Sequence, residues 1–190
     1  MKYYRAGLFV LIILLALSGC KYESYQTSDV ADYGIIKGNT DNAAVEKLFQ
    51  EMFPKTIESS FKNVVYQYHA EEGDTISCEI FLSFQFSDKK EYGNYVATIA
   101  EGTEERAFPY GENWIEYSIA DTLRIHKSDS ASYDCVDYAD VRHILVNPQT
   151  QTIVYSLIRV LDGGGTRVSD ISIFFNHFGI DPVEYASRTS

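Results

Sequence analysis

The order of apolar and polar residues predicts two helices. Apolar residues recur at helical spacing within residues 44–52, directly after the polar run 39–41, whose side chains are suited to capping a first turn. Pro54 follows and predicts the end of this helix. A second helix is predicted from Asp88, which stands three residues before Glu91 at the spacing of a capping box and precedes an apolar stripe.

Alternating apolar and polar residues predict strands elsewhere. The clearest strand covers residues 76–86, where every second residue is apolar and most of the others are polar, the pattern of a half-buried antiparallel strand. The further predicted strands are residues 64–69, 115–125, 141–146, 153–161 and 168–175. Asp121 interrupts the alternation and predicts a bulge or break. Turn-forming residues at 147–151 and 163–165 predict that the last three strands form a meander.

These segments predict an α+β fold, an antiparallel sheet of about five to six strands with two main helices packed on one face. The length of the chain fits one domain, which we place at residues 34–190. Residues 20–33 are polar apart from tyrosines and small residues and have no clean period. We therefore expect them to form a flexible tether ahead of the domain.

The N-terminal segment has the composition of a targeting signal. Two basic residues within the first five precede an apolar run at residues 8–17. A membrane-spanning helix takes about 20 apolar residues, so this run is too short to cross a bilayer. We interpret residues 1–19 as a signal peptide that is removed.

The tetrapeptide Leu17-Ser18-Gly19-Cys20 closes the apolar run and resembles the lipobox of bacterial lipoproteins. The resemblance implies that the Cys20 thiol carries a diacylglyceryl group and becomes the mature N-terminus. It therefore implies a protein anchored by lipid to the extracytoplasmic face of a cell membrane, where two or more acyl chains bind stably. The alternative is an ordinary secretory signal with an incidental cysteine. The resemblance covers residues 1–20 and implies nothing about the activity of the domain.

The charge of the chain excludes two classes of partner. The formal net charge is −11, and loss of Lys2 and Arg5 with the signal peptide changes it to −13. Binding to nucleic acid or to anionic lipid headgroups depends on clustered lysine and arginine, which the chain does not have. The acidic surface favours solubility, with a cationic partner as the less favoured interpretation.

The two remaining cysteines leave two interpretations open. Cys78 and Cys135 form an even pair once Cys20 is acylated, and a disulfide between them would stabilise the fold by roughly 4 kcal/mol in the chain-entropy estimate. Two separate buried thiols are the alternative, since Cys78 lies on the apolar face of its predicted strand. No local feature places a histidine beside either thiol, which argues against a catalytic cysteine.

An acidic segment between residues 129 and 143 contains the candidate metal ligands. Asp134, Asp137, Asp140 and His143 recur every three residues, and on a helix this spacing would bring oxygen and nitrogen ligands to one side for a divalent cation. Solvated acids in a short amphipathic turn explain the same pattern. The spacing of an EF-hand loop and the HExxH zinc motif are both missing.

Aromatic residues provide a further candidate for ligand contact. The chain has 15 tyrosines, 11 phenylalanines and one tryptophan, and exposed tyrosine or tryptophan can stack on a sugar or anchor a protein partner. The candidates are Tyr110, Trp114, Tyr133 and Tyr138. Packing within strands is the alternative role for these residues.

No sequence motif assigns a reaction. The GxSxG elbow, the SxxK pair and the phosphate-binding loop are missing, and we expect no cofactor. An exported domain of this kind is more often a binding module than an enzyme. We therefore expect a membrane-anchored lipoprotein that acts through binding or envelope association, with an envelope protein or a glycan as partner. The alternatives are a cell-surface hydrolase that uses carboxylates and a surface protein that depends on divalent cations.

Overall fold

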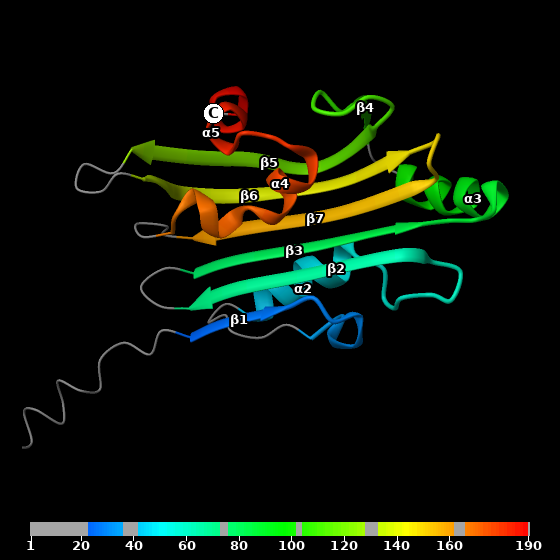
Figure 1. Ribbon diagram of the computed structural model, residues 1–190, viewed down its shortest axis with the longest axis horizontal. Helices are drawn as coiled ribbons and strands as arrows, with labels where there is room; N and C mark the ends of the chain where they lie inside the picture. Colours follow the sequence, from blue (N-terminus) through cyan, green and yellow to red (C-terminus); the bar gives the residue numbers. More distant parts are fainter. Residues whose placement is uncertain are drawn as a thin grey trace, which may run out of the picture.

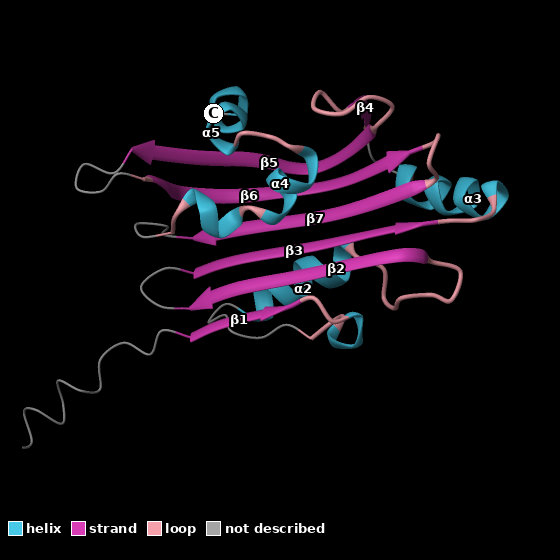
Figure 2. Ribbon diagram, viewed as in Figure 1, coloured by secondary structure: helices cyan, strands magenta, loops and turns pink. Residues whose placement is uncertain are grey.

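The computed structural model describes residues 23–35, 42–72, 76–101, 104–127, 133–161 and 166–189. Within these residues, seven strands form one antiparallel sheet in the order β1-β2-β3-β7-β6-β5-β4 (Figure 2). The strands are β1 (Glu23–Thr27), β2 (Lys62–Glu72), β3 (Ile76–Gln85), β4 (Glu105–Ala107), β5 (Ile115–Lys127), β6 (Asp134–Asn147) and β7 (Thr152–Leu161). The predicted α+β class and the antiparallel sheet are confirmed, whereas the predicted number of strands is too low.

Helices cover both faces of the sheet. The helical segments of the described residues are η1 (Val30–Asp32), α2 (Asn42–Met52), α3 (Lys89–Ala100), η2 (Val168–Ile171), α4 (Ile173–Phe178) and α5 (Pro182–Thr189). The two predicted helices correspond to α2 and α3, which share one face, while η2, α4 and α5 cover the other face and the β5 edge (Figure 1). None of these described helices has the length and apolar character needed to cross a membrane.

The segment expected to be a tether belongs to the domain. β1 pairs with β2 along its whole length, and the side chain of Asp29 caps η1 by accepting from the Ala31 N–H. The Tyr33 hydroxyl then donates to the carbonyl oxygen of Pro54 at 2.5 Å. The tether prediction is therefore wrong for residues 23–33, and residues 20–22 lie outside the described part of the chain.

The last predicted strand is also wrong, because residues 168–175 form η2 and the first half of α4. Two features define α4. Gly179 takes the left-handed conformation that ends the helix, with φ of 66°, and the buried carboxylate of Glu79 accepts the N–H groups of Ile173 and Phe174 at its start. The cap comes from β3, almost a hundred residues earlier, so the local sequence did not reveal it.

The hydrophobic core has two layers, one on each face. The α2–α3 face buries Phe49, Phe53, Phe61, Phe84 and Tyr155 among others, and the α4–α5 face buries Leu123, Val141, Ile158, Phe174 and Phe175 among others. The second layer changes the environment of β3. Its polar positions Ser77, Glu79 and Ser83 are buried, although the alternating pattern indicated a strand with one solvated face.

Several local predictions are confirmed. The carboxylate of Asp88 accepts the N–H groups of Lys90 and Glu91, both at 2.8 Å, and so begins α3. β6 and β7 form the predicted hairpin, and β5 contains a bulge next to Asp121, between Ser118 and Ala120. The bulge places Asp121 on the same face of the sheet as Glu116.

Candidate functional site

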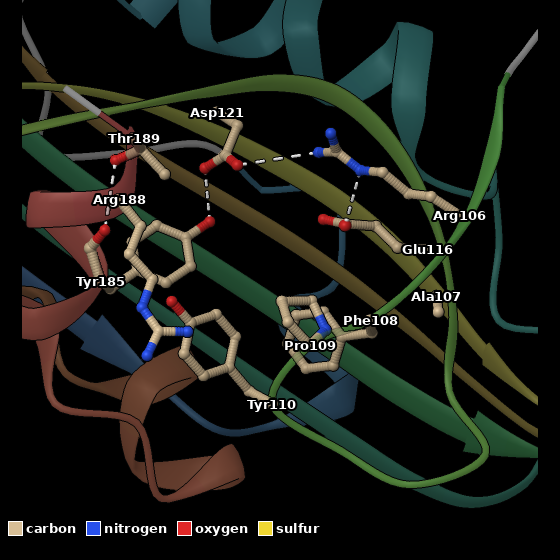
Figure 3. A pocket seen from close by; sticks show the side chains of 10 residues that line it. All are labelled: Arg106, Ala107, Phe108, Pro109, Tyr110, Glu116, Asp121, Tyr185, Arg188 and Thr189. Carbon is tan, nitrogen blue, oxygen red and sulfur yellow. Dashed lines mark hydrogen bonds and ion pairs between the residues drawn. The ribbon is translucent and has the colours of Figure 1, made fainter.

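A cavity of about 280 Å³ opens at the β5 edge of the sheet, between the segment that leads from β4 to β5 and the C-terminal helix α5 (Figure 3). We call it the edge pocket. It is lined by Arg106, Ala107, Phe108, Pro109, Tyr110, Glu116, Asp121, Tyr185, Arg188 and Thr189. The lining therefore combines guanidinium groups, carboxylates and aromatic rings.

The bulge in β5 brings two carboxylates to this pocket. Glu116 and Asp121 are five residues apart, so in a regular strand they would point to opposite faces of the sheet. The register of β5 against β6 shifts between Ser118 and Ala120, and the extra residue reverses the alternation. Both carboxylates consequently line the edge pocket.

Five side chains close a ring of polar contacts behind the pocket, which we call the polar ring. Arg106 Nε lies 2.8 Å from Glu116 Oε2, and Glu116 Oε1 lies 2.5 Å from His143 Nδ1. His143 Nε2 lies 2.6 Å from the hydroxyl of Tyr185, which donates to Asp121 Oδ1 at 2.5 Å. Asp121 Oδ2 lies 3.7 Å from Arg106 Nη2. The ring links β4, β5, β6 and α5 and so fastens the C-terminal helix to the sheet edge.

The polar ring extends from the protein interior to the pocket surface. The side chains of His143 and Glu116 are only 1% and 4% exposed, whereas that of Arg106 is 50% exposed. The imidazole of His143 packs almost flat against the ring of Phe174, with 5.2 Å between the ring centroids. Because the inner members are fixed by burial and packing, the outer members are held in place before any ligand arrives.

Electrostatics keep Glu116 ionised. Burial alone would raise the pKa of Glu116, but the contact with His143 and the charge of Arg106 outweigh burial, so the pKa is lowered. Burial and the hydrogen bond to Asp121 both raise the pKa of Tyr185. At neutral pH the site therefore holds a carboxylate at Glu116 and a neutral phenol at Tyr185.

The contact with Glu116 assigns one proton of the His143 ring. An ionised Glu116 only accepts, so its close contact with Nδ1, which is an ion pair more than an aligned hydrogen bond, requires a proton on that nitrogen. The hydroxyl of Tyr185 lies against Nε2 and donates to Asp121 Oδ1, so it links the imidazole to the second carboxylate. The guanidinium of Arg106 contacts both carboxylates and partly balances their charge.

The outer wall of the pocket joins a second guanidinium to aromatic surface. Arg188 lies with its guanidinium carbon 5.3 Å from the centroid of the Tyr110 ring and contacts Glu184 Oε1 at 2.5 Å. The ring of Tyr110 in turn lies 5.5 Å from that of Tyr185. Arg188 is 54% exposed, so its remaining N–H groups are open to a ligand.

The pKa shifts in this site oppose two catalytic roles. A carboxylic acid that donates a proton must keep it at neutral pH, yet the pKa of Glu116 is lowered. The raised pKa of Tyr185 opposes its use as a base. What the site offers is a rigid surface with unused N–H donors and aromatic carbon.

The structure does not bring together the predicted cation ligands Asp134, Asp137, Asp140 and His143. All four lie on β6, a strand, where residues three apart point to different faces instead of following one side of a helix. Asp137 pairs with His126, Asp140 pairs with Arg142, and His143 belongs to the polar ring. Among the described residues, no three histidine, cysteine, aspartate or glutamate side chains are grouped to hold a metal ion.

The structure agrees with the second interpretation of the cysteines, two separate buried thiols. Cys78 and Cys135 are buried free thiols. Cys78 lies on β3 opposite Arg159 of β7, and the whole of β7 separates β3 from the strand that contains Cys135. Cys20, the predicted lipidation site, lies outside the described residues.

Two of the four candidate aromatic residues lie at or beside the edge pocket. Tyr110 lines it, and Trp114 lies in the same loop, edge-on to Phe178. Tyr133 and Tyr138 are elsewhere, each with an arginine over its ring. The structure therefore supports a shared location only for Tyr110 and Trp114.

Sequence reasoning missed Arg106, Glu116, Tyr185 and Arg188 as site residues. Glu116 occupies a polar position in an alternating strand, which normally indicates a solvated side chain, and its face is covered by helices that the pattern did not predict. Asp121 gave the one local signal, since it broke the alternation at the bulge.

Comparison of the chain with protein-family models, with curated proteins and with solved structures finds no match.

Proposed function

We propose that this protein is a lipoprotein anchored through Cys20 to the extracytoplasmic face of a cell membrane, and that its domain binds a ligand of the cell envelope in the edge pocket. The anchor is supported by the sequence Leu17-Ser18-Gly19-Cys20 at the end of a short apolar run. The binding role is supported by the geometry of the pocket.

The polar ring is the observation on which the binding role rests. Burial of charged groups is costly unless they are paired, and here Arg106, Glu116 and Asp121 are held next to a cavity by contacts with one another. A site that is ordered in advance loses little conformational entropy when a ligand binds. The half-exposed Arg106 and Arg188 present the remaining donors to the cavity.

The position of the pocket in the sheet agrees with an anchored binding module. Cys20 precedes the first residue of β1 by three residues, a span of at most about 10 Å. β1 is one edge of the sheet and β5 is five strands away, which corresponds to about 24 Å at the usual strand spacing (Figure 1). An anchor at Cys20 therefore holds the β1 edge near the membrane and leaves the edge pocket far from the attachment point.

The hydrolase alternative is favoured by one observation, that Glu116 and Asp121 line the same cavity. Both carboxylates are paired with Arg106, and the lowered pKa of Glu116 opposes a role as proton donor. Binding without chemistry accounts for these pairings directly.

Two measurements on the full chain test the proposal. Mass spectrometry of the N-terminal peptide is expected to show a diacylglyceryl group on Cys20, and an unmodified cysteine would contradict the anchor. Thermal unfolding with cell-wall fragments, oligosaccharides, divalent cations and a chelator tests the binding role. A ligand at 100 times its Kd stabilises the fold by about 2.7 kcal/mol, which raises the midpoint by several degrees.

The matched variants are Arg188→Ala, inside the pocket, and Arg124→Ala, which removes a guanidinium that contacts Tyr138 outside it. The midpoint shift should shrink in Arg188→Ala and persist in Arg124→Ala. An equal shift in both variants would place the ligand elsewhere on the domain. Hydrolysis products in the same mixtures would favour the hydrolase.

A further inference from the structure

A second cavity adjoins the edge pocket. It has a volume of about 530 Å³ and is lined by Glu105, Arg106, Ala107, Phe108, Gly111, Asn113, Trp114, Ile115, Pro148 and Gln149. We call it the tryptophan pocket. Arg106, Ala107 and Phe108 line both cavities, so the two lie on either side of one segment of chain.

The loop that follows this segment gives each cavity an aromatic side chain. Tyr110 lines the edge pocket and Trp114 lines the tryptophan pocket. The loop is closed by a hydrogen bond from the Phe108 N–H to the Trp114 carbonyl oxygen at 3.0 Å. Gly111 packs so closely on the indole that a Cβ there would lie 2.7 Å from Trp114 Cδ1. The two rings are thus held by one fixed loop.

The guanidinium groups around the two cavities are already paired with carboxylates. Arg106 contacts both Glu116 and Asp121 within the polar ring. Arg188 forms an ion pair with Glu184, and Glu105 also lines the tryptophan pocket, so carboxylates outnumber guanidinium groups. An anionic ligand would meet this excess of carboxylates, and a cationic ligand would have to displace a guanidinium from its partner, so the lining favours a neutral ligand.

The ligand must also match the mixed chemistry of the walls. It needs apolar surface to lie against Tyr110 and Trp114, and polar groups that both donate and accept to meet guanidinium N–H groups and carboxylate oxygens. A sugar has both, since its ring presents C–H groups on a face and hydroxyls around the rim. Because two cavities adjoin, a sugar that fills both has more than one ring.

We propose that the two cavities together bind a neutral oligosaccharide of two or more rings, which crosses the segment formed by Arg106, Ala107 and Phe108. This inference rests on the proposed binding function of the edge pocket and specifies its ligand. One ring lies in the edge pocket near Tyr110, and the next lies in the tryptophan pocket near Trp114.

The chain provides its own reporter for the second cavity, because Trp114 is its only tryptophan. We would titrate the full chain, in a detergent without a sugar headgroup, with glucose, cellotriose, maltotriose and the trimer of N-acetylglucosamine. At least one neutral trisaccharide is expected to change the Trp114 emission and to bind at least tenfold more tightly than its monosaccharide. Calorimetry on the same samples detects binding that leaves the emission unchanged.

Variants separate the two cavities. Arg188→Ala removes a guanidinium from the edge pocket and should weaken binding of the trisaccharide at least fivefold. Gln149→Ala, an exposed residue of the tryptophan pocket, should weaken the trisaccharide and leave the monosaccharide unchanged. Lys47→Ala on α2, whose side chain is 75% exposed on the other face, is the control and should change neither.

Charged sugars and a peptide test the results that would contradict a neutral oligosaccharide. Tighter binding of trigalacturonate or of a glucosamine oligomer than of the neutral trimers would overturn the charge argument. If trialanine binds and none of the sugars does, the oligosaccharide proposal is wrong, but the proposed binding function stands. If no probe binds by either readout while the edge-pocket variants still lose the stabilisation by cell-wall fragments, the oligosaccharide is wrong and the proposed function stands. If no probe binds and the edge-pocket variants keep the full stabilisation by cell-wall fragments, both proposals are overturned.

Discussion

The α2–α3 face and the α4–α5 face of the sheet are both closed by helices, but they bury different chemistry. Beneath α2 and α3 lie aromatic and aliphatic side chains in direct contact, such as Phe61 stacked on Phe84 with 3.9 Å between the ring centroids. Beneath α4 and α5 the apolar layer also encloses Glu79, Glu116 and His143. The first face gains stability from apolar burial, whereas the second depends on completed polar contacts, because an unpaired buried charge is costly.

The difference explains where the pockets of the candidate site are. Aromatic packing closes the first face without specifying a particular arrangement of polar groups. The polar ring on the second face requires fixed partners from β4, β5, β6 and α5, and its outer members line the edge pocket. Substitutions on the two faces should therefore differ in size and in their dependence on pH.

The largest expected effect is on the apolar face. Phe84→Ala removes a fully buried ring that contacts Phe61 and Tyr155, and it should lower the free energy of unfolding by about 3–5 kcal/mol. This loss should vary little with pH, because the ring does not titrate. Urea unfolding at several pH values is the measurement. Val65→Ala, at a side chain that is 44% exposed, is the control and should change the stability by less than about 0.5 kcal/mol.

Glu116→Gln tests the polar face. It leaves the buried His143 and the guanidinium of Arg106 without their carboxylate, a loss of about 3 kcal/mol at neutral pH. The pKa of Glu116 is lowered in the folded state, so its stabilising contribution is present above about pH 4.5 and disappears as the pH falls through the lowered value. Stability curves of the two proteins should therefore converge in acid. The control is Glu112→Gln, at an exposed residue, and a pH-independent loss in Glu116→Gln would contradict the ion pair.

Glu79 gives the opposite pH dependence. Burial raises the pKa of Glu79 to about 7 in the fold, against the two N–H groups of α4 that lower it, so the folded protein holds a proton there that the unfolded chain releases near pH 4.5. Stability from this group is full below about pH 4.5 and is lost as the pH rises through about 7, by about 3 kcal/mol. Comparison with Glu79→Gln across pH 4–8 isolates this slope. Parallel curves for the two proteins would show that Glu79 does not titrate in this range.

The smallest effect is expected from Tyr185→Phe. The substitution keeps the packed ring and removes only the hydroxyl between His143 and Asp121, so we expect a loss of about 1–3 kcal/mol. Nuclear magnetic resonance of the His143 ring nitrogens should show a changed chemical shift at Nε2, because its hydrogen-bond partner is gone. Tyr133→Phe, at a residue that is 39% exposed, is the control. An unchanged stability and ring spectrum in Tyr185→Phe would argue against the polar ring.

Local sequence patterns were sufficient for much of the α2–α3 face. The apolar spacing of residues 44–52 predicted α2, Asp88 predicted the start of α3, and the alternation of residues 76–86 predicted β3. Asp121 also predicted the bulge in β5. Each of these signals lies within the segment that it describes, so neighbouring residues carry it.

The α4–α5 face was not predictable in the same way. The pattern of residues 168–175 suggested a strand, but a carboxylate from β3 caps α4 and turns the segment into a helix. Residues 23–27 have no distinct period of their own, and they become β1 by pairing with β2. In both cases the deciding partner is distant in the sequence.

The sequence by itself determined the class of the fold, the helices of one face, most of the strands and the excess of negative charge, because periodicity, capping and composition are local or summed properties. It also contains the lipobox-like segment that predicts an anchor. The tertiary structure decided which carboxylates are buried, since a polar residue on a strand is solvated or enclosed according to what covers that face. It also assembled the polar ring and the two adjoining cavities from four elements, because only folding brings Arg106, Glu116, His143 and Tyr185 within contact distance.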